Sequence, residues 1–211
     1  MRDAIAKYPD LWGVLTTPQS GGNLSRALDA CSAWAMDNDR FNADISAARA
    51  CKIWYDKFLA WLERCQDWRD KCLFVVAPDI VCDARATLRE FPYWYTVIRG
   101  YGYPVAFALQ NGVEGVGVPW SWINFVFVGG DNEFKEGPIV ARLAREASER
   151  GIGVHVGRVN SRRRALMSAK IGADTIDGTH EAYAPDAHIP KWNRWLTEMQ
   201  AITSGKQLRM F

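Results

Sequence analysis

The segment from Gly153 to Thr179 contains two short apolar runs with a capped helix between them. The first run is Val154–Val156, the second starts at Ala173, and both have the length of buried strands. Between them, Ser161 can cap a helix over Arg162–Ile171. This order predicts a βαβ unit, in which parallel strands bring the residues that follow them to the same edge of a sheet.

The rest of the chain repeats this alternation of strands and helices. Strand-like runs lie at Gly13–Thr16, Ala33–Met36, Leu73–Ala77, Val105–Leu109, Phe125–Val128, Val154–Val156 and Thr175–Ile176. Helical spacing of apolar residues covers Ile45–Trp68, Ala84–Gly100, Pro138–Arg150 and Lys191–Ile202, and we expect Pro92 to break or kink the second of these helices. Apolar strands that alternate with helices predict a parallel sheet, either a barrel or a doubly wound sheet.

The residues that follow the strands favour the barrel. Polar or glycine residues end nearly every run: Asp37, Asp79, Gln110, Gly129-Gly130-Asp131, Arg158 and Asp177. In a closed barrel all of them converge on one mouth, whereas a doubly wound sheet concentrates its ligand residues at a switch point. We therefore expect an α/β fold, a compact TIM-type (β/α) barrel of seven to eight parallel strands, with the eighth strand either hidden or missing and an irregular tail after Gly205.

Composition narrows the class of protein further. With 211 residues, 48% of them hydrophobic, the chain suits one domain over residues 1–211, and its net charge of +2 does not by itself indicate a nucleic-acid binder. The five cysteines are odd in number and form no Cys-x-x-Cys, which favours free thiols in a reducing, cytoplasmic compartment. No signal peptide and no apolar stretch of about 18 residues is found, so no membrane partner is expected.

Six motifs at strand ends resemble a known family. They are Asp37-Asn38-Asp39-Arg40-Phe41, Ala77-Pro78-Asp79-Ile80-Val81-Cys82-Asp83, Leu109-Gln110-Asn111-Gly112, Phe127-Val128-Gly129-Gly130-Asp131-Asn132-Glu133-Phe134-Lys135, His155-Val156-Gly157-Arg158-Val159-Asn160-Ser161 and Ile176-Asp177-Gly178-Thr179. In this order they resemble the queuine- and archaeosine-type guanine transglycosylases, and more closely the 7-deazaguanine DNA transglycosylase-like proteins of phages and bacteria. The resemblance implies a βα barrel that exchanges a guanine in a polynucleotide for a deazaguanine base.

The resemblance also implies two catalytic carboxylates. Asp177 matches the family's nucleophile, which attacks the anomeric carbon of the sugar and forms a covalent glycosyl-enzyme. Asp37 matches its general acid and base, which protonates the leaving base and deprotonates the incoming one. The alternative is that either aspartate only caps a helix or begins a turn, as the Asp-Gly sequence at 177–178 would also suit.

Base recognition is implied for a second group of residues. Asp79, Gln110, Gly129 and Gly130 match base-binding positions of the family, and a carboxylate can accept the N1–H and N2–H donors of guanine. Phe41 can stack on the base or belong to the core. For Asp79 the alternative is an ordinary loop, and for the two glycines it is an ordinary turn.

A third group is expected to bind phosphate or polynucleotide. Arg158 and Asn160 follow a strand at the barrel mouth, and Arg162 and Arg163 open a helix, where a bound phosphate would offset their unfavourable interaction with the helix dipole. The alternative for the helical arginines is a solvated basic face. No cofactor is expected, and no metal, because the zinc cluster of the tRNA enzymes has no counterpart here: no cysteine follows Cys82.

The sequence thus predicts a pentosyltransferase that acts on DNA, with RNA as the less favoured polymer and a free 7-deazaguanine base as second substrate. Two alternatives stay open. The same site could pass the glycosyl group to water, which would make the protein a glycosylase for a modified base, or the barrel could bind modified nucleotides without turnover. The sequence leaves a homodimer open.

Overall fold

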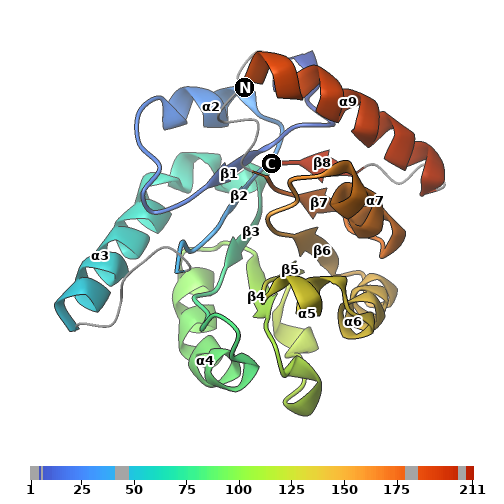
Figure 1. The fold of residues 1–211 in the computed structure, drawn as a ribbon. Helices are drawn as coiled ribbons and strands as arrows, with labels where there is room; N and C mark the ends of the chain where they lie inside the picture. The colour runs from blue at the N-terminus through green and yellow to red at the C-terminus, as the bar shows by residue number, and fades with distance from the viewer. Residues whose placement is uncertain (1–4, 6, 41–47, 179–184, 204–207) are drawn as a thin grey trace.

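The computed structural model describes residues 5, 7–40, 48–178, 185–203 and 208–211, and of residues 48–51 and 185 only the backbone. Eight strands form one parallel sheet in the order β1-β2-β3-β4-β5-β6-β7-β8. Their bounds are β1 Val14–Thr16, β2 Trp34–Met36, β3 Cys72–Val76, β4 Val105–Leu109, β5 Phe125–Val128, β6 Gly153–Val156, β7 Thr175–Ile176 and β8 Arg209–Met210. In Figure 1 they curl around a common axis with the helices outside them.

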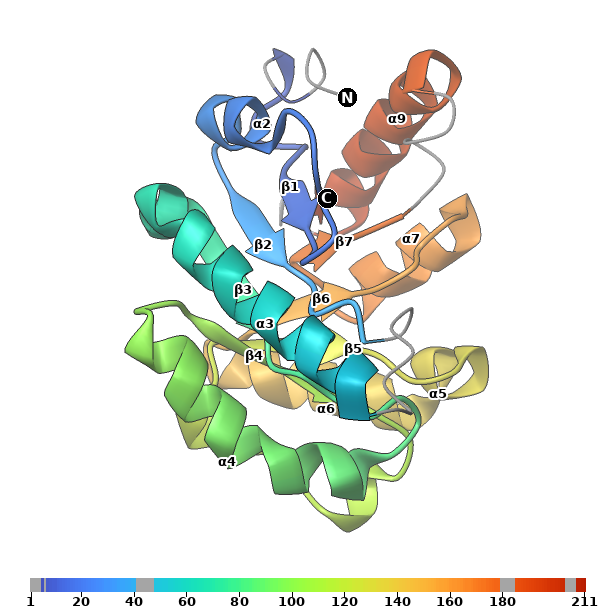
Figure 2. The same cartoon turned by 90° about the vertical axis from the view of Figure 1, so that its left-hand side faces the viewer.

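The helices occupy the connections between strands. They are α2 Leu24–Ala30, α3 Ala48–Arg64, α4 Ala84–Gly100, α5 Asn132–Glu136, α6 Pro138–Glu149, α7 Arg162–Lys170 and α9 Pro185–Ile202, with 3₁₀ turns η1 Gln66–Lys71, η2 Val113–Gly115 and η3 Trp120–Trp122. Seen from the side, α3 crosses in front of the sheet and α4 lies below it (Figure 2). The fold is therefore α/β, with the architecture of a TIM-type barrel.

The sheet closes on itself through β8. Trp12, just before β1, forms a parallel bridge with Met210. The N–H of Gly13 donates to the carbonyl of Met210 at 2.8 Å, and the N–H of Met210 donates to the carbonyl of Leu11 at 2.8 Å. These bonds satisfy the two edges that an open eight-stranded sheet would leave unpaired.

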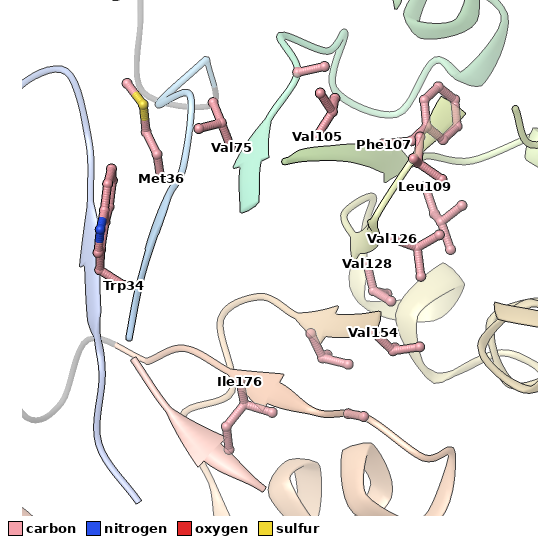
Figure 3. Close-up of a cluster of buried hydrophobic side chains, with 14 of the residues drawn as sticks. Trp34, Met36, Val75, Val105, Phe107, Leu109, Val126, Val128, Val154 and Ile176 are labelled. Atoms are coloured by element: carbon pink, nitrogen blue, oxygen red, sulfur yellow. The ribbon is translucent and has the colours of Figure 1, made fainter. Parts of the chain in front are cut away.

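Alternation along the strands divides the buried side chains into two clusters. One, here called the outer cluster, lies between strands and helices, and Figure 3 shows its labelled members from β2 through β7. The other, the inner cluster, fills the barrel, and its buried members are Ala35, Phe74, Val76, Ala106, Ala108 and Phe211. Because several inner positions are alanine, the barrel has room for the ring of Phe211.

Polar side chains cap three helices that begin directly after strands or their loops. Asp83 accepts from the N–H of Ala86 at 2.9 Å at the start of α4, and Asp131 accepts from that of Phe134 at 2.8 Å at the start of α5. Ser161 caps α7 as expected. These caps satisfy N–H groups that the helix cannot pair internally, and they fix the turns at the mouth of the barrel.

The fold confirms the predicted barrel and all seven predicted strands to within one residue at each end. The eighth strand is β8, so the expectation of an irregular chain end after Gly205 is wrong for Arg209–Met210. Helix α4 continues through Pro92, so of the predicted break or kink the break is wrong. The short helices α2 and α5 were not predicted. Within the described residues, no helix combines the length and apolarity needed to cross a membrane.

The contact between Gly13 and Phe211 gives a test of barrel closure. A Cβ on Gly13 would lie 1.8 Å from the Phe211 ring and 2.9 Å from the carbonyl of Ala33. We expect Gly13→Ala to lower the free energy of unfolding by about 1–3 kcal/mol through overpacking, and Phe211→Ala to lower it by about 3 kcal/mol through the cavity it leaves.

In the double variant the clash with the ring is absent. Its loss of unfolding free energy should therefore be smaller than the sum of the losses in the two single variants. Urea unfolding of the wild type, both single variants and the double variant measures this coupling. Strictly additive losses would contradict the packing of Phe211 against Gly13.

Candidate active site

A cavity of about 740 Å³ lies at the carboxyl ends of the strands. Seven residues predicted from strand ends line it together: Asp37, Asp79, Gln110, Gly129, Gly130, Arg158 and Asp177. Each lies at the end of one of the strands β2 to β7 or in the loop that follows it. The convergence that the barrel predicts is therefore present. Phe41 lies outside the described residues.

Asp37 follows β2 and is partly buried at the cavity wall. The backbone N–H of Asp39 donates to its Oδ1 at 3.1 Å. Burial, and next the negative charge of Asp177, raise the pKa of Asp37 to about 7. A carboxyl group with this pKa holds or releases a proton near neutral pH, which is the range a general acid and base requires.

Asp177 follows β7 and is held by two N–H donors on different oxygens. The backbone N–H of Arg158 donates to Oδ1 at 2.9 Å, and the Nε2 of His155 lies 2.9 Å from Oδ2. The backbone carbonyl of Asp177 accepts from the N–H of Val159 at 2.6 Å. Its carboxylate is thus fixed in orientation at the cavity, with only 12% of the side chain exposed.

Asp79 is bonded to the two amide side chains beside it. Asn38 Nδ2 donates to Asp79 Oδ1 at 2.8 Å, and Gln110 Nε2 donates to Oδ2 at 2.5 Å. The other end of the Gln110 amide accepts from the N–H of Cys82 at 2.8 Å. Burial raises the pKa of Asp79, and the two amide bonds oppose that rise. The three side chains form one rigid polar wall of the cavity.

The two glycines after β5 leave space that neighbouring side chains use. A Cβ on Gly129 would lie 2.4 Å from Nε2 of Gln110, so the missing side chain is what allows this amide to reach Asp79. Gly130 has a φ of +74°, and a Cβ there would lie 2.6 Å from the Phe134 ring. Glycine is required at both positions. At Gly129 it makes room for the Gln110 side chain, and at Gly130 it allows a left-handed turn.

Among the described residues, three other than glycine are left-handed, and the backbone N–H of each bonds to a side chain of the cavity. They are Asp39, Cys82 and Arg158, each with φ of 59°. Their backbone N–H groups donate to Asp37, Gln110 and Asp177 respectively. A left-handed residue with a side chain costs roughly 1–2 kcal/mol. This strain accompanies the hydrogen bonds that orient the polar groups of the cavity, as is common at functional sites.

Two cationic side chains line the same cavity as the carboxylates. Lys135 on α5 is buried and donates from Nζ to the carbonyl of Gly157 at 3.1 Å, and Arg158 lies beside it. Burial, with a smaller contribution from Arg158, lowers the pKa of Lys135 to about 8. A ligand of this cavity meets carboxylates, Asp37 and Asp177, and cations on one surface.

The remaining predicted residues do not line the cavity. Arg162 pairs with Glu198 at 2.8 Å and Arg163 pairs with Glu136 at 2.6 Å, in both cases on the exposed surface. These carboxylates supply the negative charge that the start of α7 needs, although exposed pairs add little stability. The amide oxygen of Asn160 lies 2.9 Å from where a Cβ of Gly178 would be, so Asn160 packs at the rim beside the end of β7.

Three residues of the site were not singled out from the sequence. Asn38 and Lys135 stand inside the quoted motifs, and the signal for His155 was a polar residue in the middle of an apolar run. Among the residues that the structure describes, no three His, Cys, Asp or Glu side chains are grouped as metal ligands. The described cysteine side chains, Cys31, Cys65, Cys72 and Cys82, are free thiols.

Comparisons with known proteins give only remote structural likenesses. No protein-family model matches the sequence, and no curated protein matches it. The chain is similar to tryptophan synthase from M. tuberculosis, at 14% identity over 98% of this chain and 96% of that one, with a TM-score of 0.47. It is also similar to a psychrophilic glycoside hydrolase family 10 endo-beta-1,4-xylanase, at 8% identity over 100% and 88% of the chains and a TM-score of 0.39. At these values neither likeness indicates a function.

The raised pKa of Asp37 makes stability depend on pH. The pKa of its carboxyl group rises from 3.8 to about 7 on folding, so the folded chain binds the proton more tightly than the unfolded chain. The folded chain therefore loses stability as pH rises between these values. Asp37→Asn cannot ionise, and its amide oxygen can still accept from Asp39. We expect this variant to gain stability over the wild type as pH rises from about 4 to 7, by up to roughly 4 kcal/mol above pH 7.

Urea unfolding between pH 4 and 8 measures the gain. Asp70→Asn, at a side chain that is 97% exposed, is the control and should show a small, pH-independent change. A constant difference between Asp37→Asn and the wild type across this range would rule out the raised pKa.

Proposed function

We propose that the protein is a pentosyltransferase that exchanges a guanine base in DNA for a 7-deazaguanine derivative through a covalent intermediate on Asp177. One observation carries this proposal. Asp37 and Asp177 line the same cavity, and burial together with the charge of Asp177 brings the pKa of Asp37 to about 7. Two carboxyl groups in unequal states, one protonated and one ionised, are what base exchange at a sugar carbon needs.

In the first half of the reaction, a lone pair of the Asp177 carboxylate forms a bond to C1′ of the sugar. The bond from C1′ to N9 of guanine breaks, and its electron pair goes to the base. Asp37 gives its proton to the departing base, so guanine leaves neutral and Asp37 becomes a carboxylate. The product of this half is a glycosyl ester of Asp177.

In the second half, Asp37 takes the proton from N9 of the incoming 7-deazaguanine. The base then attacks C1′, and the electron pair of the ester bond returns to Asp177. Both carboxyl groups end in the states in which they began, so exchange needs no other reactant. If water takes the place of the base, the same steps give a glycosylase.

The polar wall of Asp79, Asn38 and Gln110 suits a guanine-like base. Each carboxylate oxygen of Asp79 already accepts one N–H, and a second lone pair on each remains for the N1–H and N2–H of the base. The amides keep the carboxylate from rotating. Gly129 and Gly130 line the cavity beside this wall, and the missing side chain of Gly129 gives the Gln110 amide its place there.

DNA as the polymer rests on the resemblance of the sequence motifs. A base inside a duplex cannot reach the cavity, so the target nucleotide has to be flipped out or single-stranded. Arg158 stands at the cavity and supplies a positive charge near the entering backbone. The ion-paired Arg162 and Arg163 do not line the cavity, so a bound strand would meet them beyond the target base.

Base exchange tests the proposal directly. The protein is incubated with DNA, or separately with tRNA, and 7-cyano-7-deazaguanine, and each polymer is digested to nucleosides for mass spectrometry. We expect the exchanged nucleoside in DNA. Asp177→Asn should reduce exchange by at least about 1,000-fold and abolish a covalent adduct on a denaturing gel, because the amide is not a nucleophile.

Asparagine is the better substitution here because Asp177→Ala would leave the buried N–H of His155 without an acceptor, at a cost of about 1–3 kcal/mol in stability. Asp70→Asn is the matched surface control. Release of a free base without incorporation would favour the glycosylase, and unchanged DNA and tRNA would favour a binding protein.

The pH dependence of the rate tests the role of Asp37. Its carboxyl group must be protonated to release guanine, and its pKa is about 7. We therefore expect kcat/KM for DNA to fall about tenfold for each pH unit above 7. Asp37→Asn should remove this limb and most of the activity. A rate that is flat from pH 6 to 9 in the wild type would assign the proton transfer to another group.

A further inference from the structure

His155 is a fully buried polar residue in the interior of the barrel. It stands on β6, where its side chain is 0% exposed. Its ring is stacked on Phe127 at 4.7 Å between centroids and tilted against Phe74 at 5.2 Å. An aliphatic or aromatic side chain would suit this apolar surrounding better, because a buried polar group costs free energy unless it is hydrogen-bonded.

Both ring nitrogens of His155 have a partner. Nε2 lies 2.9 Å from Oδ2 of Asp177, and Nδ1 lies 2.8 Å from Oγ1 of Thr175. A carboxylate oxygen only accepts, so the proton must be on Nε2. The hydroxyl of Thr175 can then donate to Nδ1, and this assignment satisfies every polar atom of the chain from Thr175 through His155 to Asp177.

We propose that His155 is a positioning residue for Asp177, held by Thr175 as the imidazole with its proton on Nε2. The inference rests on the proposed function, because it assigns to His155 the orientation of the nucleophile in base exchange. His155 does not touch the substrate. It fixes Oδ2, while the backbone N–H of Arg158 fixes Oδ1, so the carboxylate can neither rotate nor tilt away from C1′.

The same hydrogen bond acts in both halves of the exchange. When Asp177 forms the ester, its charge disappears and the bond to His155 weakens. When the ester breaks, the electron pair returns to the carboxylate, and the N–H of His155 again stabilises the negative charge. His155 therefore orients the attack of the first half and favours release of the glycosyl group in the second.

Three variants separate this role from packing. His155→Leu keeps a buried apolar volume and removes the donor, and His155→Gln keeps an N–H near the position of Nε2. Thr175→Val keeps the shape of Thr175 and removes the hydroxyl that fixes the tautomer. We expect kcat for exchange to fall on the order of 100-fold in His155→Leu and on the order of tenfold in Thr175→Val, with unchanged KM for the free base. His155→Gln should recover most of the loss.

The kinetic outcomes decide between the two roles. Folded His155→Leu with wild-type kcat would overturn the proposal. Equal losses in folded His155→Gln and His155→Leu would do so too, because they would mean that the ring serves packing alone. If His155→Leu fails to fold, the other two variants decide the question. A kcat near that of the wild type in His155→Gln, with a roughly tenfold lower kcat in Thr175→Val, supports the positioning role. A wild-type kcat in Thr175→Val overturns it.

A measurement independent of activity keeps the inference distinct from the proposed function. Two-bond ¹H–¹⁵N correlation on protein labelled with ¹⁵N-histidine reports which ring nitrogen carries the proton, and the signal of His155 is the one absent in His155→Gln. We expect a proton on Nε2, a shift in Asp177→Asn and mixed tautomers in Thr175→Val. A proton on Nδ1 alone would overturn the proposal. If the wild type exchanges no base in either polymer but this pattern is found, the proposed function fails while the contact of His155 with Asp177 stands.

Discussion

Closure of the sheet is the constraint on which the rest of the structure depends. Hydrogen bonds of Met210 with Leu11 and Gly13 join the last strand to the first, and the interior has room for Phe211 because several inner positions are alanine. Strands in a closed parallel sheet all end at one rim. Residues far apart in the chain, such as Asp37 and Asp177, therefore line one cavity, which an open sheet of the same strands would not guarantee.

Burying three carboxyl groups at the cavity costs free energy, and this cost explains the left-handed backbone residues beside them. Carboxylates at Asp37, Asp79 and Asp177 are withdrawn from water, and each needs donors to stay buried. Amide side chains meet part of that need at Asp79. Left-handed residues, Asp39 and Arg158, meet another part by turning a backbone N–H toward a carboxylate. Local strain and oriented charge thus have the same origin.

Periodicity and strand ends were enough to predict most of the fold and seven of the residues that line the cavity. Strands that are apolar on both faces have a clear signal, and barrel topology then places the polar residues after them at one mouth. The two-residue strand Arg209–Met210 has no such signal, because pairing with neighbours alone makes it a strand. The left-handed turns and the bond between His155 and Asp177 depend on tertiary contacts, which no local pattern encodes.

The carboxyl groups of Asp37 and Asp177 have unequal surroundings although the residue type is the same. Burial, and next the negative charge of Asp177, raise the pKa of Asp37 to about 7, although one backbone N–H opposes that rise. Asp177 receives two N–H donors, one of them from the barrel interior. In the proposed exchange the first is therefore suited to move a proton and the second to carry charge and form the bond to sugar. The interior donor is His155, at a buried position of β6 where an apolar residue would be expected. The proposed division of roles between Asp37 and Asp177 therefore depends on this one strand position.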